Sequence, residues 1–361
     1  MTPSFTRRTL VLAAAVAATS FACVAQAQSA ADIAKAKAEG TVVIYSTTDQ
    51  KQVSPLIKDF EALYPGIKVE YHDMNSTEVY NRFISESAVG ASADVVWSSS
   101  MDQAVKLVND GYAQPYKLSD TSKLPEWSIW KNEAFGTTFE PIGIVYNKRL
   151  VDAAEVPKTH AEFTKLLTTK LEKFKGKVTT YDPEKSGVGF MLHSQDALAN
   201  NAGFWELAKA MGQSGVRVQT SVGTMLERIA SGENLIGYNM IGSYALVRAA
   251  KDPSIGVAFT QDYNLVFSRV TFIAKQAKHV AAARVWLEYV LSQRGQTVIA
   301  NQADLFAIRS DVQGDTTISG LKASLGTALK PIPIAPALLT YLDQSKRLDF
   351  LKQWNSVKAP K

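Results

Sequence analysis

Cysteine is almost absent from this sequence of 361 residues, in which Cys23 is the single example. Cys23 lies in an N-terminal segment that we expect to be cleaved off. The mature chain should then contain no disulfide, no thiolate nucleophile and no cysteine metal site. An exported protein can fold without disulfides when its core is large enough, and the remaining chain of about 334 residues is long enough for two domains.

Catalytic and metal-binding motifs are also missing. The sequence contains no H-E-x-x-H, no G-x-S-x-G and no Walker motif. The four histidines stand singly, without the spacing of metal ligands, at His72, His160, His193 and His279. These absences predict a protein that is not an enzyme and that needs neither a cofactor nor a metal.

No excess of one charge marks a surface for nucleic acid. The chain has 39 Lys and Arg against 34 Asp and Glu, a formal charge of +5. The two signs are interspersed, which is typical of a solvated surface, and we expect no nucleic-acid partner. No apolar run beyond the N-terminal segment approaches the length of a membrane span.

The N-terminal segment has the three parts of an export signal. Arg7 and Arg8 form a basic start, residues 10–18 are apolar, and Ala-Gln-Ala at 25–27 fits a cleavage site. We expect residues 1–27 to be a signal peptide that directs the protein to the periplasm. The paired arginines also fit a twin-arginine signal, and this alternative to an ordinary secretory signal stays open.

The first hundred residues of the mature chain alternate between strands and helices. Proline and glycine at 65–66 and Gly111 end two of the helices. Such alternation with short joints predicts a doubly wound α/β sheet. We expect strands at 41–45, 67–71 and 93–97 and helices at 51–64, 76–88 and 101–110.

The middle of the chain contains a second series of the same kind. Its pattern suggests a second α/β lobe inserted into the first, to which the chain returns near residues 267–274. We expect strands at 141–147, 178–182, 236–239, 257–260 and 270–273 and helices at 161–167, 187–211 and 281–298.

Six segments carry a resemblance to a known family. They are VVIYS at 42–46, F-x4-PGIKV at 60–69, ADVV at 93–96, IVYN at 144–147, RV-x-FIAK at 269–275 and AAR-x-WL-x-YVLS at 282–292. In order and spacing they resemble the periplasmic solute-binding proteins of ABC transporters, in the branch that includes ferric-ion, phosphonate and sugar-phosphate binders. The likeness runs over nearly the whole mature chain.

The resemblance implies a two-lobed periplasmic-binding-protein fold, type II-like, in which a hinge closes the lobes around one solute. Each lobe should be a mixed, mostly parallel sheet flanked by helices. We expect lobe 1 to comprise residues 28–140 and 265–305, and lobe 2 to comprise residues 141–264 and 306–361. The resemblance also implies a monomer that delivers its solute to an inner-membrane ABC permease.

Hydroxyl groups gather where strands give way to helices, which is where open α/β sheets bind ligands. Free N–H groups and the helix dipole at such points favour anions, although serine and threonine there can also be simple helix caps. The first-lobe candidates are Ser46, Thr47, Thr48, Ser98 and Ser99. Those expected from the second lobe are Ser186, Gly187, Tyr146, Tyr238, Asn239, Ser243 and Tyr244, with core packing as the alternative for the tyrosines.

The ligands that the resemblance implies for a ferric site are not all present. Ferric binders use a histidine, a glutamate and two adjacent tyrosines, whereas residues 46–51 offer only Asp49 and residues 97–101 offer serines. Tyr244 is preceded by Ser243, so the tyrosine pair is missing as well. Hydroxyl clusters better suit a small anionic solute such as an organophosphate, sugar phosphate or phosphonate.

Other functions stay open at this point. A ferric or other metal binder is one alternative within the same fold. An exported enzyme would need an acid–base pair in the cleft, for which Asp49 and Asp102 are the available candidates. Arg269 can be either an anion ligand or an ion-pair residue at the hinge. A sensor that presents its ligand to a membrane receptor cannot be told from a transport protein by sequence.

Overall fold

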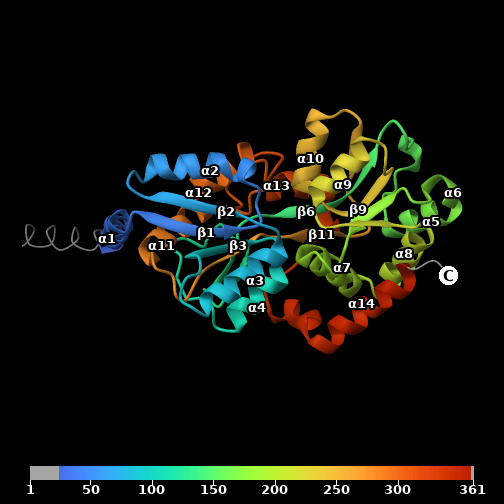
Figure 1. Ribbon diagram of the computed structural model, residues 1–361. Coiled ribbons are helices and arrows are strands. Elements are labelled where there is room, and N and C mark those ends of the chain that lie inside the picture. Colours follow the sequence, from blue (N-terminus) through green and yellow to red (C-terminus); the bar gives the residue numbers. More distant parts are fainter. Residues whose placement is uncertain (1–23, 359–361) are drawn as a thin grey trace, which may run out of the picture.

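The computed structural model describes residues 24–358, which form two lobes side by side (Figure 1). Most of the expected signal peptide, with Cys23, lies outside the described residues. The last four residues of the signal, 24–27, begin helix α1 (Val24–Glu39). No helix within residues 24–358 combines the length and the apolar character that crossing a bilayer requires.

The first lobe is built on a sheet of six strands. β1 pairs in parallel with β2 and β3, while β12 joins β3 and β5 in antiparallel fashion. Along the sheet the strands are β2 (Lys68–Asp73), β1 (Thr41–Ser46), β3 (Val95–Ser98), β12 (Val270–Ile273), β5 (Ala134–Gly136) and β4 (Ile129–Trp130).

Helices cover both faces of this sheet because its strands are apolar on both sides. Val42 and Ile44 pack with Trp286 on one face, whereas Val96 packs with Phe83 on the other. The helices around this sheet are α1, α2 (Gln50–Leu63), α3 (Ser76–Ser87), α4 (Met101–Asn109), α11 (Val280–Leu291), α12 (Gln293–Asn301) and α13 (Ile318–Leu325).

The second lobe has a mixed sheet of seven strands, with antiparallel pairs at its centre and parallel pairs toward both edges. β6 lies in the middle and pairs with β9, β11 and β10, all antiparallel. Its strands are β13 (Leu329–Pro331), β11 (Asn264–Phe267), β6 (Glu140–Asn147), β9 (Ile236–Ile241), β7 (Val178–Tyr181), β8 (Arg217–Gln219) and β10 (Ile255–Ala258).

The helices of the second lobe again lie on both faces of their sheet (Figure 1). Ile144 and Tyr238 pack toward α5, α8 and α14, while Val145 and Met240 pack toward α9 and α10. These helices are α5 (His160–Thr169), α6 (Leu171–Phe174), α7 (Gly187–Ala199), α8 (Asn201–Gln213), α9 (Val222–Ala230), α10 (Gly242–Lys251) and α14 (Gln344–Lys358).

The chain passes between the two sheets at neighbouring points. Residues 137–139 connect β5 to β6, and residues 268–269 connect β11 to β12. The two connections are tied together, because the Thr137 N–H donates to the Arg269 carbonyl at 2.9 Å. A third crossing leads from α13 into β13. The short 3-10 helix η4 (Pro336–Leu342) then packs on α4 before α14 packs on α8.

The two-lobed α/β fold is confirmed, and the structure refines several elements. More strand pairs are antiparallel than the pattern predicts, because in the first sheet β12 pairs antiparallel with β3, β5 with β12 and β4 with β5. Two expected long helices are each broken. Asn200 caps α8 and Ser292 caps α12, and each accepts a backbone N–H with its side chain.

The predicted lobe boundaries stay a prediction. The expected strand at 257–260 begins earlier, at 255, and β11 at 264–267 had not been expected. Ile308, Ile318 and Leu321 belong to the same apolar cluster as Val42 and Ile44 of the first sheet. The third crossing therefore lies after these residues, near residue 326.

Candidate functional site

A cavity of about 280 Å³ lies between the lobes and has walls from both. Most of the residues that line it have polar side chains, among them Arg269 of the connection between β11 and β12. Lobe 1 contributes Thr47, Asp49, Asp73, Met74, Asn75, Ser76 and Ser99. The lining residues of lobe 2 are Tyr181, Lys185, Ser186, Val188, Thr220, Ser221, Val222, Gly223, Ile241 and Tyr244.

Six helices begin at this cavity. Residues at or next to their N-termini line it: Asp49 for α2, Asn75 for α3, Ser99 for α4, Ser186 for α7, Ser221 for α9 and Ile241 for α10. The carboxyl ends of the strands place them there. Each N-terminus carries a partial positive charge, so the cavity favours a negatively charged group.

Hydroxyl groups at the ends of β1 and β3 meet in the first-lobe wall. Thr47 and Ser99 both line the cavity, and their side-chain oxygens lie 3.1 Å apart. The Ser99 N–H also donates to Thr47 Oγ1 at 2.8 Å. Two hydroxyls thus face the cavity from neighbouring strands, as the sequence pattern predicts.

Two other hydroxyls of these clusters, those of Ser46 and Ser98, bond the backbone, and that of Thr48 accepts from Arg269. Ser46 Oγ accepts from the Thr48 N–H at 3.1 Å, and Ser98 Oγ accepts from the Ser100 N–H at 3.1 Å. All of them are buried, and Ser46, Thr48 and Ser98 do not line the cavity. Serine at a strand end here stabilises the turn into the next helix.

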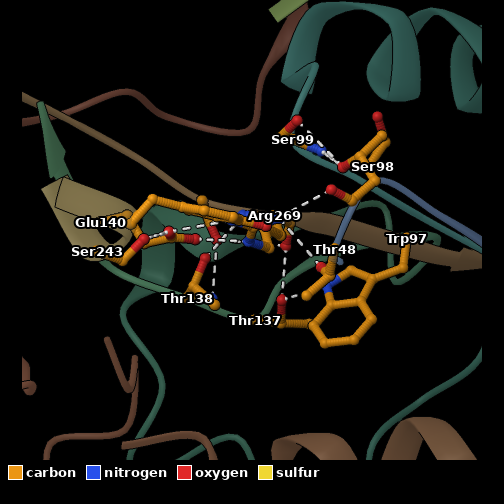
Figure 2. Close-up of polar contacts among 12 residues, drawn as sticks. Thr48, Trp97, Ser98, Ser99, Thr137, Thr138, Glu140, Ser243 and Arg269 are labelled. Carbon is orange, nitrogen blue, oxygen red and sulfur yellow. Dashed lines mark hydrogen bonds and ion pairs between the residues drawn. The ribbon is translucent and has the colours of Figure 1, made fainter. Parts of the chain in front are cut away.

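Arg269 is the centre of a buried network at the crossing (Figure 2). It is 1% exposed, and its Nε lies 2.8 Å from Oε1 of the fully buried Glu140. Its Nη1 also donates to Thr48 Oγ1 at 3.1 Å. Burial alone would lower the pKa of Arg269, but the charge of Glu140 outweighs it and raises the pKa above its ordinary value. Arg269 is therefore a charged residue already neutralised by its partner.

Asp49 and Tyr244 bridge the two lobes across the cavity. The Tyr244 hydroxyl donates to Asp49 Oδ1 at 3.1 Å, and its ring lies 5.4 Å from the Arg269 guanidinium. Burial raises the pKa of Asp49, as does the charge of Asp73, while the hydrogen bond from Tyr244 lowers it. The structure is thus a conformer in which the lobes touch through polar groups.

The structure places the other second-lobe candidates at different points. Ser186 lines the cavity and caps α7 by accepting from the Gly189 N–H at 3.2 Å. Gly187 does not line it. A Cβ at this position would lie 2.7 Å from Gln103 Oε1, so the glycine lets α7 approach α4 of the first lobe. Ser243 is buried and donates to Glu140 beside Arg269.

Tyr146, Tyr238 and Asn239 lie in the body of the second lobe and do not line the cavity. The Tyr238 hydroxyl donates to the buried Asp196. Asn239 hydrogen-bonds His193 Nδ1 at 3.2 Å. Tyr146 packs against the apolar cluster of that lobe. Tyr238 and Asn239 thus have polar partners inside the lobe, and Tyr146 is held there by apolar packing.

Sequence reasoning did not select several of the lining residues. Asp73 ends β2 just as Ser46 ends β1, so its position at a strand end was a usable signal. Ser221 begins α9, and its side chain caps that helix by accepting from the Thr224 N–H. Lys185 lies in the turn before α7, and only the packing of the two lobes brings it to the cavity.

The residues around the cavity do not form a metal cage. Within residues 24–358 no group of three or more His, Cys, Asp and Glu side chains could hold a metal ion. Asp49 and Tyr244, the residues nearest to the ferric pattern, are bonded to each other. The polar groups that the wall offers to a solute are therefore mostly neutral hydroxyls and backbone N–H groups.

Comparison with known proteins identifies the family. The bacterial extracellular solute-binding proteins match residues 55–322 of the chain. A solved substrate-binding protein of an ABC transporter from Agrobacterium tumefaciens is 38% identical, with a TM-score of 0.83, and the match covers 88% of this chain and 94% of that one. No curated protein matches the chain.

Two further structures share the fold at lower identity. AfuA from Actinobacillus pleuropneumoniae, solved with fructose-6-phosphate bound, is 16% identical over 88% of this chain and 98% of that one, with a TM-score of 0.72. Iron-bound HitA from Pseudomonas aeruginosa is 17% identical over 88% of this chain and 99% of that one, with a TM-score of 0.69. The chain belongs to the bacterial extracellular solute-binding protein family.

Proposed function

We propose that this protein is the solute-binding component of an ABC importer and that it captures a small anionic solute in the cavity between its lobes. The solute class is an organophosphate, a sugar phosphate or a phosphonate. The role in transport is supported by family membership and by the relative from an ABC transporter in Agrobacterium tumefaciens. The anionic class is supported by the geometry of the cavity.

The observation that carries the anionic class is the convergence of six helix N-termini on one cavity. Their backbone N–H groups and dipoles attract negative charge without a buried counter-ion. Thr47 and Ser99 add two hydroxyls that can donate to anion oxygens. Lys185 adds a positive charge at the rim.

Arg269 does not supply the charge that holds the anion. Its guanidinium is paired with Glu140 and bonded to Thr48, so its charge is already compensated. Asp49 and Asp73 lie in the same wall, and carboxylates accept hydrogen bonds. A solute with hydroxyl groups at the end opposite its anion matches this wall best.

The proposal also includes how the protein works. The lobes open and close about residues 137–139 and 268–269, and the solute favours the closed form. The protein acts as a monomer in the periplasm, binds no nucleic acid, has no enzymatic activity, and delivers its solute to an inner-membrane permease. The two-lobed fold and the family support this picture.

A thermal-shift screen tests the solute class. The panel contains sugar phosphates, glycerol phosphates, phosphonates, dicarboxylates, polyamines and ferric citrate. A solute at about one hundred times its dissociation constant adds roughly 2.7 kcal/mol to the stability of the folded state, which raises the melting temperature visibly. We expect a shift with phosphorylated or phosphonate compounds. A shift confined to polyamines or to ferric citrate would contradict a phosphate or phosphonate solute.

A further inference from the structure

Beside the cavity, the lobes also meet in a tight seam. The Val188 N–H at the start of α7 donates to Ser76 Oγ of the first lobe at 3.1 Å. Gln103 of α4 lies against Gly187 of α7. A Cβ at position 187 would lie 2.7 Å from the Oε1 atom of Gln103. This seam, made of the first turns of α3, α4 and α7, is closed only while the lobes are together.

Asp102 lies in the first turn of α4, next to Gln103 in this seam. Asp102 is 3% exposed. Its Oδ1 accepts from Ser100 Oγ and from the Gln103 N–H, both at 2.8 Å, and both partners belong to the start of its own helix. No ion pair of Asp102 occurs in the part of the chain that the structure describes. A carboxylate is thus buried without a cation in contact.

Few charged groups face Asp102 from the elements packed against α4. Strands β3, β5 and β12 contain no titratable side chain. Helix η4 carries Tyr341, and α7 carries His193 and Asp196, which are bonded within the second lobe. On α4 itself, Lys106 and Asp110 pair with each other at 2.6 Å.

Arg347 of α14 is the cation that acts on Asp102 through space. Its guanidinium lies 4.0 Å from the ring of Phe190 on α7, so Arg347 belongs to the second-lobe side of the seam. Helix α14 packs on α8 of the same lobe. In the hinge movement of the proposed function, α7 and α14 would move away from α4, and the seam and the first turn of α4 would then meet water.

We infer that closing of the lobes takes up a proton at Asp102, so that the closed form of this binding protein is favoured in acidic surroundings. The inference rests on the hinge movement of the proposed function but not on the identity of the solute. It assigns Asp102 to the conformational equilibrium, not to solute binding, because Asp102 does not line the cavity.

The sign follows from the burial of the carboxylate. Burial in the closed form raises the pKa of Asp102 to about 6, whereas a solvated aspartate has a pKa of about 3.9. Above pH 6 both forms are ionised, and the buried charge disfavours closure. As the pH falls through 6, the closed form binds a proton first, so the closed-to-open ratio rises about tenfold between pH 7 and pH 5.

Single-molecule FRET on the full chain without solute measures this ratio. Cys23 is the one cysteine in the sequence, so Cys23→Ser removes it, and Lys51→Cys and Lys251→Cys supply two dye sites. Both lysines are exposed, on α2 of the first lobe and α10 of the second (Figure 1). We expect the population with the short dye separation to increase from pH 7 to pH 5.

Asp102→Asn separates this device from every other titrating group. The variant should lose the roughly tenfold rise between pH 7 and pH 5 and be more closed than the parent chain at pH 7. Asp110→Asn, at the exposed end of α4, is the matched control and should keep the full pH response. An unchanged dye separation in the parent chain, or a rise of the same size in Asp102→Asn, overturns the inference. Either result leaves the anion screen unaffected.

Discussion

At the scale of single residues, the crossing between the lobes depends on one buried ion pair. Arg269 and Glu140 are both fully buried; Arg269 lies in the connection between β11 and β12, and Glu140 begins β6. Ser243 and Thr48 complete the hydrogen bonds of the two charges. Such a pair is costly to break from one side, since the remaining charge is left buried without a partner.

Arg269→Gln should lower the free energy of unfolding by about 3–5 kcal/mol, because it leaves Glu140 buried and unpaired. Glu140→Gln should cost a similar amount for the reverse reason. The double variant should cost clearly less than the sum of the two. Urea unfolding of all four proteins in a double-mutant cycle measures this coupling.

The surface pair Lys68–Glu61 is the control for this cycle, since the lysine side chain is 76% exposed. Its coupling should be below about 1 kcal/mol. Additive effects of the Arg269 and Glu140 substitutions would show that the pair does not hold the crossing together.

Single site residues were predictable only in part. Of the residues predicted to bind the ligand, Thr47, Ser99, Ser186 and Tyr244 line the cavity, and their binding role stays a prediction. A hydroxyl that faces a ligand and one that caps a turn have the same local sequence context, so the pattern could not separate Thr47 from Ser46. Burial and hydrogen-bond partners make that distinction, and both depend on tertiary structure.

At the scale of elements, the helix N-termini are the functional feature. Helices α2 and α4 start at the carboxyl ends of β1 and β3 in the first sheet. Helices α7 and α9 start at the carboxyl ends of β7 and β8 in the second sheet (Figure 1). Apolar periodicity predicted most of these helices, because each buries one face. The breaks at Asn200 and Ser292 were not predicted, since a capping residue inside an apolar pattern looks like a surface position.

Helix α14 is the element whose packing depends most clearly on one glycine. At Gly212 on α8, a Cβ would lie 1.8 Å from the carbonyl oxygen of Val357. Gly212→Ala should therefore displace the end of α14 and destabilise the protein by about 1–3 kcal/mol, although alanine is the better helix former. Thermal unfolding measures the change.

Gly223 on α9 provides the comparison, because a Cβ there would meet only Ser221 Oγ at 3.9 Å. Gly223→Ala should leave the stability unchanged or raise it by up to about 1 kcal/mol. Equal effects of the two substitutions would show that α14 does not pack closely on α8 in solution.

At the scale of the whole molecule, two lobes and one cavity follow from a chain that crosses between sheets several times. The sequence predicted two α/β lobes from the second series of strands and helices. It did not predict β11 or the late return after α13, because short buried strands next to a crossing have no distinctive period. The cavity itself arises from the facing lobes, so residues such as Lys185 could not be assigned from local pattern.

The measurement that tests the central claim most directly is calorimetric titration of the anion found in the screen into two proteins. One is the unmodified protein, and the other carries Thr47→Val and Ser99→Ala, which removes two cavity hydroxyls. Losing two hydrogen bonds to a charged group should cost roughly 3–6 kcal/mol, a loss of at least about one hundredfold in affinity, without unfolding the chain. Ser54→Ala on α2, outside the cavity, should bind as the unmodified protein does. Unchanged affinity in the double variant would contradict the site between the lobes.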